Sequence, residues 1–282
     1  MVSWVRLLFV GAILCAPVAA HARQPAETTA ETTEWTRADK ALWLNLGAGT
    51  LALGWGTWSW DWGRSGPRFQ DEGWFGRETG EGGADKLGHA WSGYALSHAF
   101  SWQYERFGYG RDEAARYGAL SSLAVMGFIE VGDAFTDRYG FSYQDMLFNA
   151  VGAAAGYALW QYPEVARKLD FRVEYDPFRG GKRAADVSTD YNRLKYLIAL
   201  KADGFDAVEN PWLRHFELHV GFYARNYAEY KGGGTDRRRQ HLYIGIGLNL
   251  AKLLEPHVPA AGVLRYVQVP YTYVPFDRRL DR

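Results

Sequence analysis

The first part of the chain shows the hydrophobic spacing of helices. Apolar residues recur at intervals of three and four through four segments of about 20 residues each, which are rich in Ala, Gly and Trp. Asp112 and Ser142 fit the role of N-caps, and Pro163 ends the last segment. The predicted helices cover residues 39–60, 85–107, 112–135 and 142–163, with a Gly-rich loop at residues 61–83. Four such segments indicate a four-helix bundle.

After residue 170 the hydrophobic period changes to two. Residues 215–223 and 241–250 alternate apolar and polar side chains, as strands do, and the Gly-rich run at 231–236 between them predicts a long hairpin. Residues 266–274 fit a further strand, and residues 194–202 fit either an amphipathic helix or a strand. The pattern therefore predicts an α+β protein, with a helical bundle at residues 39–165 and a β-rich region at residues 166–282.

The N-terminal segment is typical of a secretory signal peptide. Arg6 precedes an apolar run at residues 7–16, and Ala20-His21-Ala22 is an A-x-A cleavage pattern. The apolar run is too short to favour the alternative, an uncleaved membrane anchor. Residues 1–22 are therefore expected to be removed, and residues 23–38 to form a flexible leader. Cys15 leaves with the signal peptide, and Ile13-Leu14 before it lacks the small residue expected next to a lipidated cysteine.

Composition narrows the function further. The 32 basic and 32 acidic residues balance, which argues against a nucleic-acid partner, and 48% hydrophobic content excludes general disorder. With no other cysteine, the mature chain has no disulfides and no thiol chemistry. Residues 41–60, 87–104 and 146–163 carry no charge, so membrane-embedded or membrane-associated helices are one expectation. A tight water-exposed bundle is the other, because Gly, Ser, Asn and His dilute these segments.

Polar residues within the helices are the strongest sign of a site. Asp85 and His89 lie four residues apart and share a helix face, as do Asp145 and Asn149. Glu130, Asp133 and Asp137 fall within roughly 60° of one another, unless the helix ends before Asp137. The candidate catalytic residues are Asp85, His89, Glu130 and Asp145, and the supporting or ligand-binding residues are Lys86, Asp133, Asp137, Ser142 and Asn149.

Such a set has two interpretations. Ionisable groups in apolar surroundings normally pair with one another or bind something. Several carboxylates with one imidazole suit a divalent cation, or general acid–base chemistry by a carboxylate beside His89. The alternative is a static network that ties the helices together. His98 lies on the opposite helix face from His89 and is expected to be structural.

Two runs in this region resemble a known family. GGADKLGHAWSGY at residues 82–94 and GFIEVGDAFTDRYGFSYQDMLFNAVGAAAGY at residues 127–157 resemble the YfiM-like bacterial envelope proteins, domain of unknown function 2279. They are also distantly similar to VanZ-like membrane proteins. The family pattern falls on Asp85, Lys86, His89, Glu130, Ser142, Asp145, Asn149 and Gly152. Asp133 stands where VanZ-like proteins usually carry Gln, which puts any shared chemistry in doubt. The resemblance implies an envelope location and a helical core, and no established reaction.

Together these observations predict an exported protein of the periplasm or outer membrane. Its polar site would bind a cation or the head group of an envelope lipid or glycan, with hydrolysis as an open option. The competing hypothesis is a non-catalytic scaffold, and whether the protein is an enzyme stays open. The partners expected are a membrane or an envelope lipid or glycan. A weaker hypothesis is sugar binding by the Trp-rich segment that holds Trp55, Trp58, Trp60, Trp62 and Trp74.

Overall fold

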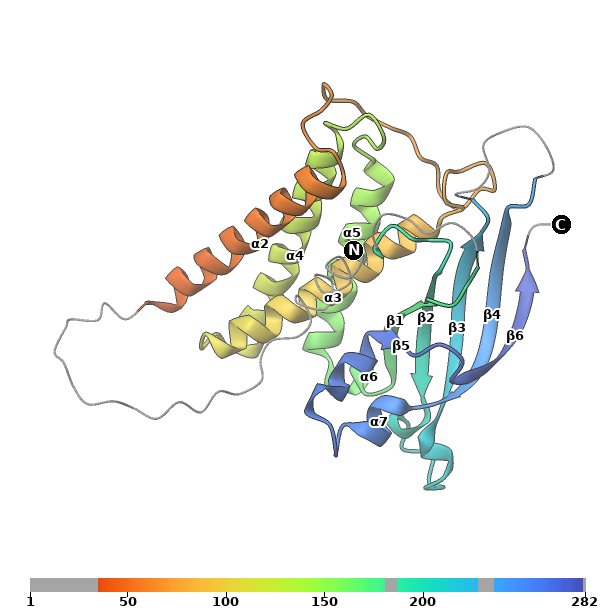
Figure 1. Ribbon diagram of the computed structural model, residues 1–282. Coiled ribbons are helices and arrows are strands. Elements are labelled where there is room, and N and C mark those ends of the chain that lie inside the picture. Colours follow the sequence, from red (N-terminus) through yellow and green to blue (C-terminus); the bar gives the residue numbers. More distant parts are fainter. Residues whose placement is uncertain (1–34, 181–186, 228–235, 281–282) are drawn as a thin grey trace.

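The computed structural model describes residues 35–180, 187–227 and 236–280. The predicted signal peptide, Cys15 and most of the Gly-rich hairpin run lie outside the described residues. The helices come first along the chain and a mixed sheet follows, in agreement with the predicted α+β class (Figure 1).

Four long helices form the N-terminal half. They are α2 (Arg37–Ser59), α3 (Ala84–Arg106), α4 (Arg111–Asp133) and α5 (Tyr143–Gln161), and the short α6 (Pro163–Ala166) follows them. The Ser142 hydroxyl accepts a hydrogen bond from the Asp145 amide and caps α5 as predicted. Asp112 is not a cap: Gly110 holds that position, and Asp112 lies in the first turn of α4.

The helices do not all pack alike. Helices α3, α4 and α5 pack closely against one another, whereas α2 lies mainly along α4. Small residues allow the close contacts: a Cβ on Gly152 of α5 would collide with the carbonyl of Ala90 on α3. Ser122 of α4 also donates a hydrogen bond to the carbonyl of Gly93 on α3. The core of the helical half is therefore a three-helix arrangement to which α2 is added.

The sequence left open whether these helices embed in a membrane. Within residues 35–180, 187–227 and 236–280, none of the helices combines the length and the apolar character that a membrane crossing requires.

The second half is a six-stranded sheet in the order β5-β1-β2-β3-β4-β6. The strands are β1 (Leu169–Tyr175), β2 (Leu194–Lys201), β3 (Phe216–Arg225), β4 (Arg239–Leu248), β5 (Val267–Gln268) and β6 (Tyr273–Arg279). Among the six strands of the described residues, the pairing of β5 with β1 is parallel and the others are antiparallel. The chain between β4 and β5 contains α7 (Leu250–Leu254) and a 3-10 helix at Pro259–Arg265.

Two details of the sheet go beyond the sequence pattern. The sequence leaves the segment at 194–202 open between helix and strand; it forms strand β2 up to Lys201, and a 3-10 helix begins at Ala202. The single strand predicted at residues 266–274 is wrong, because β5 ends at Gln268 and β6 begins at Tyr273. Pro270 has no backbone N–H to donate to a strand pairing, and Tyr271 has a φ of 64°. The chain therefore turns between β5 and β6.

Helix α3 joins the two halves and lies between the other helices and the sheet (Figure 1). Its Leu87 and Trp91 pack against Val173 and Tyr196 on one face of the sheet. The opposite face of the sheet is polar yet buried. Tyr243 and Tyr273 stack over it with ring centroids 5.6 Å apart. Helix α3 thus covers the part of the apolar face formed by β1 and the start of β2, next to the predicted site residues at the start of α3.

Candidate functional site

Side chains from three helices and one loop meet near the start of α3. The group, called the helical cluster below, consists of Glu72 from the loop, Asp85, Lys86 and His89 from α3, Glu130 from α4, and Asp145 and Asn149 from α5. Two helix starts create it. Gly83 has a φ of 80°, which lets the loop turn into α3, and the Ser142 cap fixes the first turn of α5, where Asp145 lies.

One half of the cluster is built on Lys86. This ammonium group is fully buried, and its Nζ lies 2.7 Å from Glu72, 2.6 Å from Asp85 and 2.8 Å from Asp145. The three carboxylates come from a loop and two helices, so Lys86 ties these elements together. Their charges raise the pKa of Lys86 above its ordinary value, although burial opposes the charged form.

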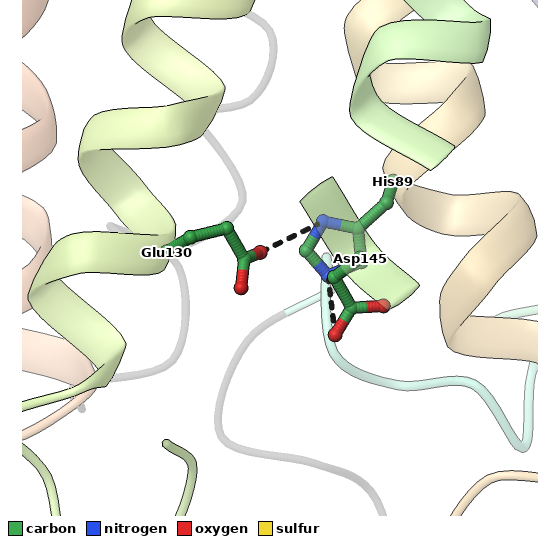
Figure 2. A group of neighbouring side chains, drawn as sticks. All are labelled: His89, Glu130 and Asp145. Atoms are coloured by element: carbon green, nitrogen blue, oxygen red, sulfur yellow. Dashed lines mark ion pairs between the residues drawn. The ribbon is translucent and has the colours of Figure 1, made fainter. Parts of the chain in front are cut away.

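The other half is built on His89, which lies between two carboxylates (Figure 2). Its Nδ1 is 3.3 Å from Glu130 Oε1 and 3.0 Å from the amide oxygen of Asn149, while its Nε2 is 3.8 Å from Asp145 Oδ2. Burial disfavours the imidazolium, but the charges of Asp145 and Glu130 outweigh it and raise the pKa of His89. Asp145 faces both Lys86 and His89 and so links the two halves.

Negative charge is in excess throughout this region. Burial, with the charges of Asp145 and Asp133 added to it, raises the pKa of Glu130 to about 8 despite the nearby imidazole. Burial likewise raises the pKa of Asp133 to about 6 and that of the neighbouring Glu81 to about 7. Glu130 therefore retains a proton near neutral pH unless another cation balances it, and Glu81 is then partly protonated.

Some polar atoms in the cluster have incomplete hydrogen bonding. Within the described part of the chain, Asp85 Oδ1 and Asn149 Nδ2 are buried without a hydrogen-bond partner, and Glu130 Oε1 has the 3.3 Å ion-pair contact with His89 in place of a hydrogen bond. Buried groups of this kind are uncommon in native proteins and call for an explanation such as a bound ion or water. The side chain of His89 is 17% exposed, whereas that of Glu130 is 2% exposed, so the imidazole is where this half of the cluster reaches solvent.

The remaining predicted site residues take other positions. Asp133 is half-buried and accepts a hydrogen bond of 2.7 Å from the indole of Trp62. Asp137 is exposed and lies beyond the end of α4, where its backbone carbonyl accepts from Arg68. Asp137 is therefore outside the cluster, because the helical spacing that aligned it with Glu130 does not continue past Asp133. Ser142 acts as a cap and donates its backbone amide to Glu130.

Sequence reasoning missed Glu72 and Glu81, which belong to the loop before α3. It also missed a second buried group, called the sheet network below, on the polar face of the sheet. The sheet network consists of Asp170, Arg172, Lys201, Glu217, His219 and Gln268. A loop has no periodicity that could link Glu72 to Lys86. The alternation of β1 and β3 was available as a signal, but it does not tell which face is buried.

Two further predictions concern aromatic and imidazole side chains. Trp62 is buried between α2 and α4, which leaves it unable to serve on a sugar-binding surface.

His98 is buried, and its two nitrogens lie 3.0 Å from the carbonyl of Gly156 and 2.8 Å from the hydroxyl of Tyr266. His98 therefore holds α3 to α5 and to the chain before β5, as a structural residue would.

A family model described as a predicted periplasmic lipoprotein, domain of unknown function 2279, matches residues 71–161. The match supports the resemblance drawn from the sequence, and it spans every residue of the helical cluster but neither α2 nor the sheet. No curated protein and no solved structure matches the chain. The similarity to VanZ-like proteins is not shown. The description of the family fits a periplasmic location. Cys15 lies outside the matched residues, so the removal of Cys15 with the signal peptide, without lipidation, stays a prediction.

Proposed function

We propose that this chain is an exported envelope protein whose helical half binds a divalent cation between His89, Glu130 and Asp145. These three residues each offer one ligand atom, and the three atoms all lie within 4.8 Å of one another. Bonds of about 2 Å place two donors on one ion at most about 4 Å apart, so the three atoms need to close only slightly around a bound ion. The match to a family described as periplasmic supports the envelope location, as does the predicted signal peptide.

Charge balance favours a cation at this place. Two positive groups, Lys86 and an imidazolium at His89, face the carboxylates of Glu72, Asp85, Glu130 and Asp145. With all groups ionised, this leaves two negative charges without a counter-charge. Bound protons can remove that surplus, which the raised pKa of Glu130 reflects. A divalent cation bound to His89 displaces the imidazolium proton, so it adds one net positive charge and reduces the surplus from two to one.

The donor types indicate which cation. Two carboxylates and one imidazole suit Mn²⁺ or Zn²⁺, whereas Ca²⁺ takes six to eight oxygen ligands. A lipid or glycan head group would need a cavity beside these side chains. A cavity of about 240 Å³ lies elsewhere, lined by residues such as Lys201, Asn249 and Arg265. The side chains of Glu130 and Asp145 are almost fully buried, which suits a small ion better than a head group.

Titration calorimetry on chelator-treated protein tests this proposal, with Mn²⁺ and Zn²⁺ as probes. We expect one ion per chain, with affinity at least roughly tenfold weaker in His89→Gln and in Glu130→Gln. Asp137→Asn is the matched control, because it removes an acid near the end of α4 that lies outside the cluster, and its affinity should equal that of the wild type. The proposal fails if neither ion binds, or if all three variants bind equally well.

The second candidate function is structural, and the Lys86 half of the cluster favours it. Carboxylates paired only with a buried ammonium hold helices together without any ligand. Under this alternative Glu130→Gln, which removes surplus negative charge, makes the fold more stable, and neither probe ion changes the unfolding temperature. Under the proposed function the ion stabilises the wild type by about 2.7 kcal/mol at a hundredfold excess over Kd.

A further inference from the structure

The sheet has an unusual distribution of polarity over its two faces. On β3 and β4 most residues of the polar face are buried, while the alternating apolar residues, apart from Phe222, are exposed. The pairing register places these apolar residues on one surface, called the apolar sheet face below. It consists of Ile198 and Leu200 on β2, Phe216, Leu218, Val220 and Phe222 on β3, Leu242, Ile244, Ile246 and Leu248 on β4, and Val274 and Phe276 on β6.

The apolar sheet face continues a surface that the protein itself already covers. Tyr196 lies opposite Phe222 on this face and packs against α3, and the ring of Phe222 contacts Phe75 of the loop before α3. Beyond this covered part the same face is open: Ile244 is 49% exposed and Phe276 is 64% exposed. The open part has the composition of a buried surface, and exposed patches of this kind mark interaction sites.

The chemistry of the face indicates what covers it. All of its twelve positions are apolar. Protein partners normally exchange about one hydrogen bond per 100–200 Å² of interface, and this face offers no side chain for one. The acyl chains of a lipid bilayer require none. We propose that the apolar sheet face rests in the acyl region of an anionic lipid bilayer.

The ends of the face fit the two chemistries found near a bilayer surface. At one end Arg278 lies opposite Leu242 and is exposed, so its guanidinium group can meet phosphate head groups. At the other end, Trp212 precedes β3 and is 79% exposed. Tryptophan is enriched at membrane–water interfaces, where its ring lies at the level of the head groups. The expected lipid contacts of the apolar sheet face, Arg278 and Trp212 do not depend on the helical cluster or on any ion bound there.

Site-specific labelling tests this inference on the full chain. A Cys15→Ala background removes the single native cysteine, so that Ile246→Cys on the face can carry an environment-sensitive fluorophore. Phe178→Cys is the control, because Phe178 is 83% exposed but lies in the turn after β1. With vesicles of phosphatidylethanolamine and phosphatidylglycerol that contain a spin-labelled acyl chain, we expect quenching at position 246 and little at position 178. Equal quenching at both positions, or none at position 246, would overturn the inference.

Co-sedimentation with the same vesicles gives a second measurement. The double variant Ile244→Gln with Ile246→Gln should partition at least roughly tenfold more weakly than Phe178→Gln, since two apolar side chains lose their burial in lipid. Circular dichroism checks that the double variant folds, and the labelling result stands even if it does not. Unchanged partitioning contradicts a lipid-facing sheet. So does a dimer in analytical ultracentrifugation without lipid that protects the label at position 246, since a second copy then covers the face.

Discussion

The helical cluster and the sheet network are both buried, yet they differ in how their charges balance. In the sheet network, Arg172 forms hydrogen bonds to Glu217 at 2.6 and 2.9 Å and to Asp170 at 2.7 Å, and Lys201 contacts Asp170 at 2.6 Å. Two cations thus face two carboxylates, and Gln268 and His219 complete the contacts. In the helical cluster carboxylates outnumber cations.

The consequence appears in the ionisation of two buried glutamates. Burial disfavours the charge of Glu217, but His219 and Arg172 outweigh it, and the pKa of Glu217 lies below its ordinary value. Glu130 is equally well buried, and its pKa rises to about 8, since one imidazole cannot offset burial and the charges of Asp145 and Asp133. The number of counter-charges, more than burial itself, decides whether a buried carboxyl is ionised. A balanced network is complete in itself, whereas an unbalanced one can accept a further cation.

The largest effect is expected from breaking the balanced network. Arg172→Met leaves Glu217 and Asp170 buried without their main cation, so the free energy of unfolding should fall by about 3–5 kcal/mol. Urea unfolding followed by circular dichroism measures the change. Arg167→Met is the control: Arg167 is one-third exposed and pairs with exposed Asp206, so its loss should lower the free energy of unfolding far less than Arg172→Met does. Equal losses in the two variants would show that the sheet network contributes no more than a surface ion pair.

The next effect uses pH to separate the two groups. In chelator-treated protein, unfolded Glu130 loses its proton near 4.5, while folded Glu130 keeps it until about 8. Unfolding therefore releases a proton within this range, and the stability that the protonated group provides is lost as the pH rises from about 4.5 to about 8. Glu130→Gln should remove a decline on the order of 3 kcal/mol across that range, as measured by urea unfolding at a series of pH values.

Glu217→Gln is the matched control for this pH experiment. The pKa of Glu217 is lowered, so its contribution is present above the unfolded value of 4.5 and is lost as the pH falls below it. Glu217→Gln should therefore leave the decline between about 4.5 and 8 unchanged. If Glu130→Gln also leaves it unchanged, Glu130 is ionised in the folded protein and the charge surplus of the helical cluster is balanced some other way.

The helical half was largely predictable because its signals are local. Ser142 and Pro163 mark the ends of α5, and helical spacing aligned Asp85 with His89, which the structure places in one cluster with Glu130. The helical spacing that aligned Asp137 with Glu130 does not apply, because α4 ends at Asp133 and an angle along a helix has no meaning beyond its last residue. Glu72 could not be found, because its contact with Lys86 depends on how a loop without periodicity folds back on α3.

The sheet half was less predictable for a different reason. Alternation identified β3 and β4, and β1 alternates as regularly, with Asp170 and Arg172 between apolar residues. An alternating strand is normally taken to turn its polar face to water and its apolar face to the core. Here the polar face is buried and much of the apolar face is exposed. Alternation in the sequence identifies two faces of a strand but does not predict which face is buried. Burial depends on how the strands pair over long distances in the chain and on where α3 packs.

The smallest effect concerns His98, a buried group whose hydrogen-bond partners within the described residues, the carbonyl of Gly156 and the hydroxyl of Tyr266, are uncharged. Burial lowers the pKa of His98 to about 4, whereas the unfolded imidazole binds a proton near 6.5. Unfolding therefore takes up a proton between these values, and stability is lost as the pH falls from about 6.5 towards 4. His98→Gln keeps a donor for the carbonyl of Gly156 but cannot titrate, so it should remove an acid loss on the order of 2 kcal/mol. Tyr266→Phe, which deletes the other hydrogen bond, should leave that loss in place. An unchanged acid slope in His98→Gln would mean that His98 charges in the folded protein, and burial without counter-charges would then not suffice to keep a group neutral here.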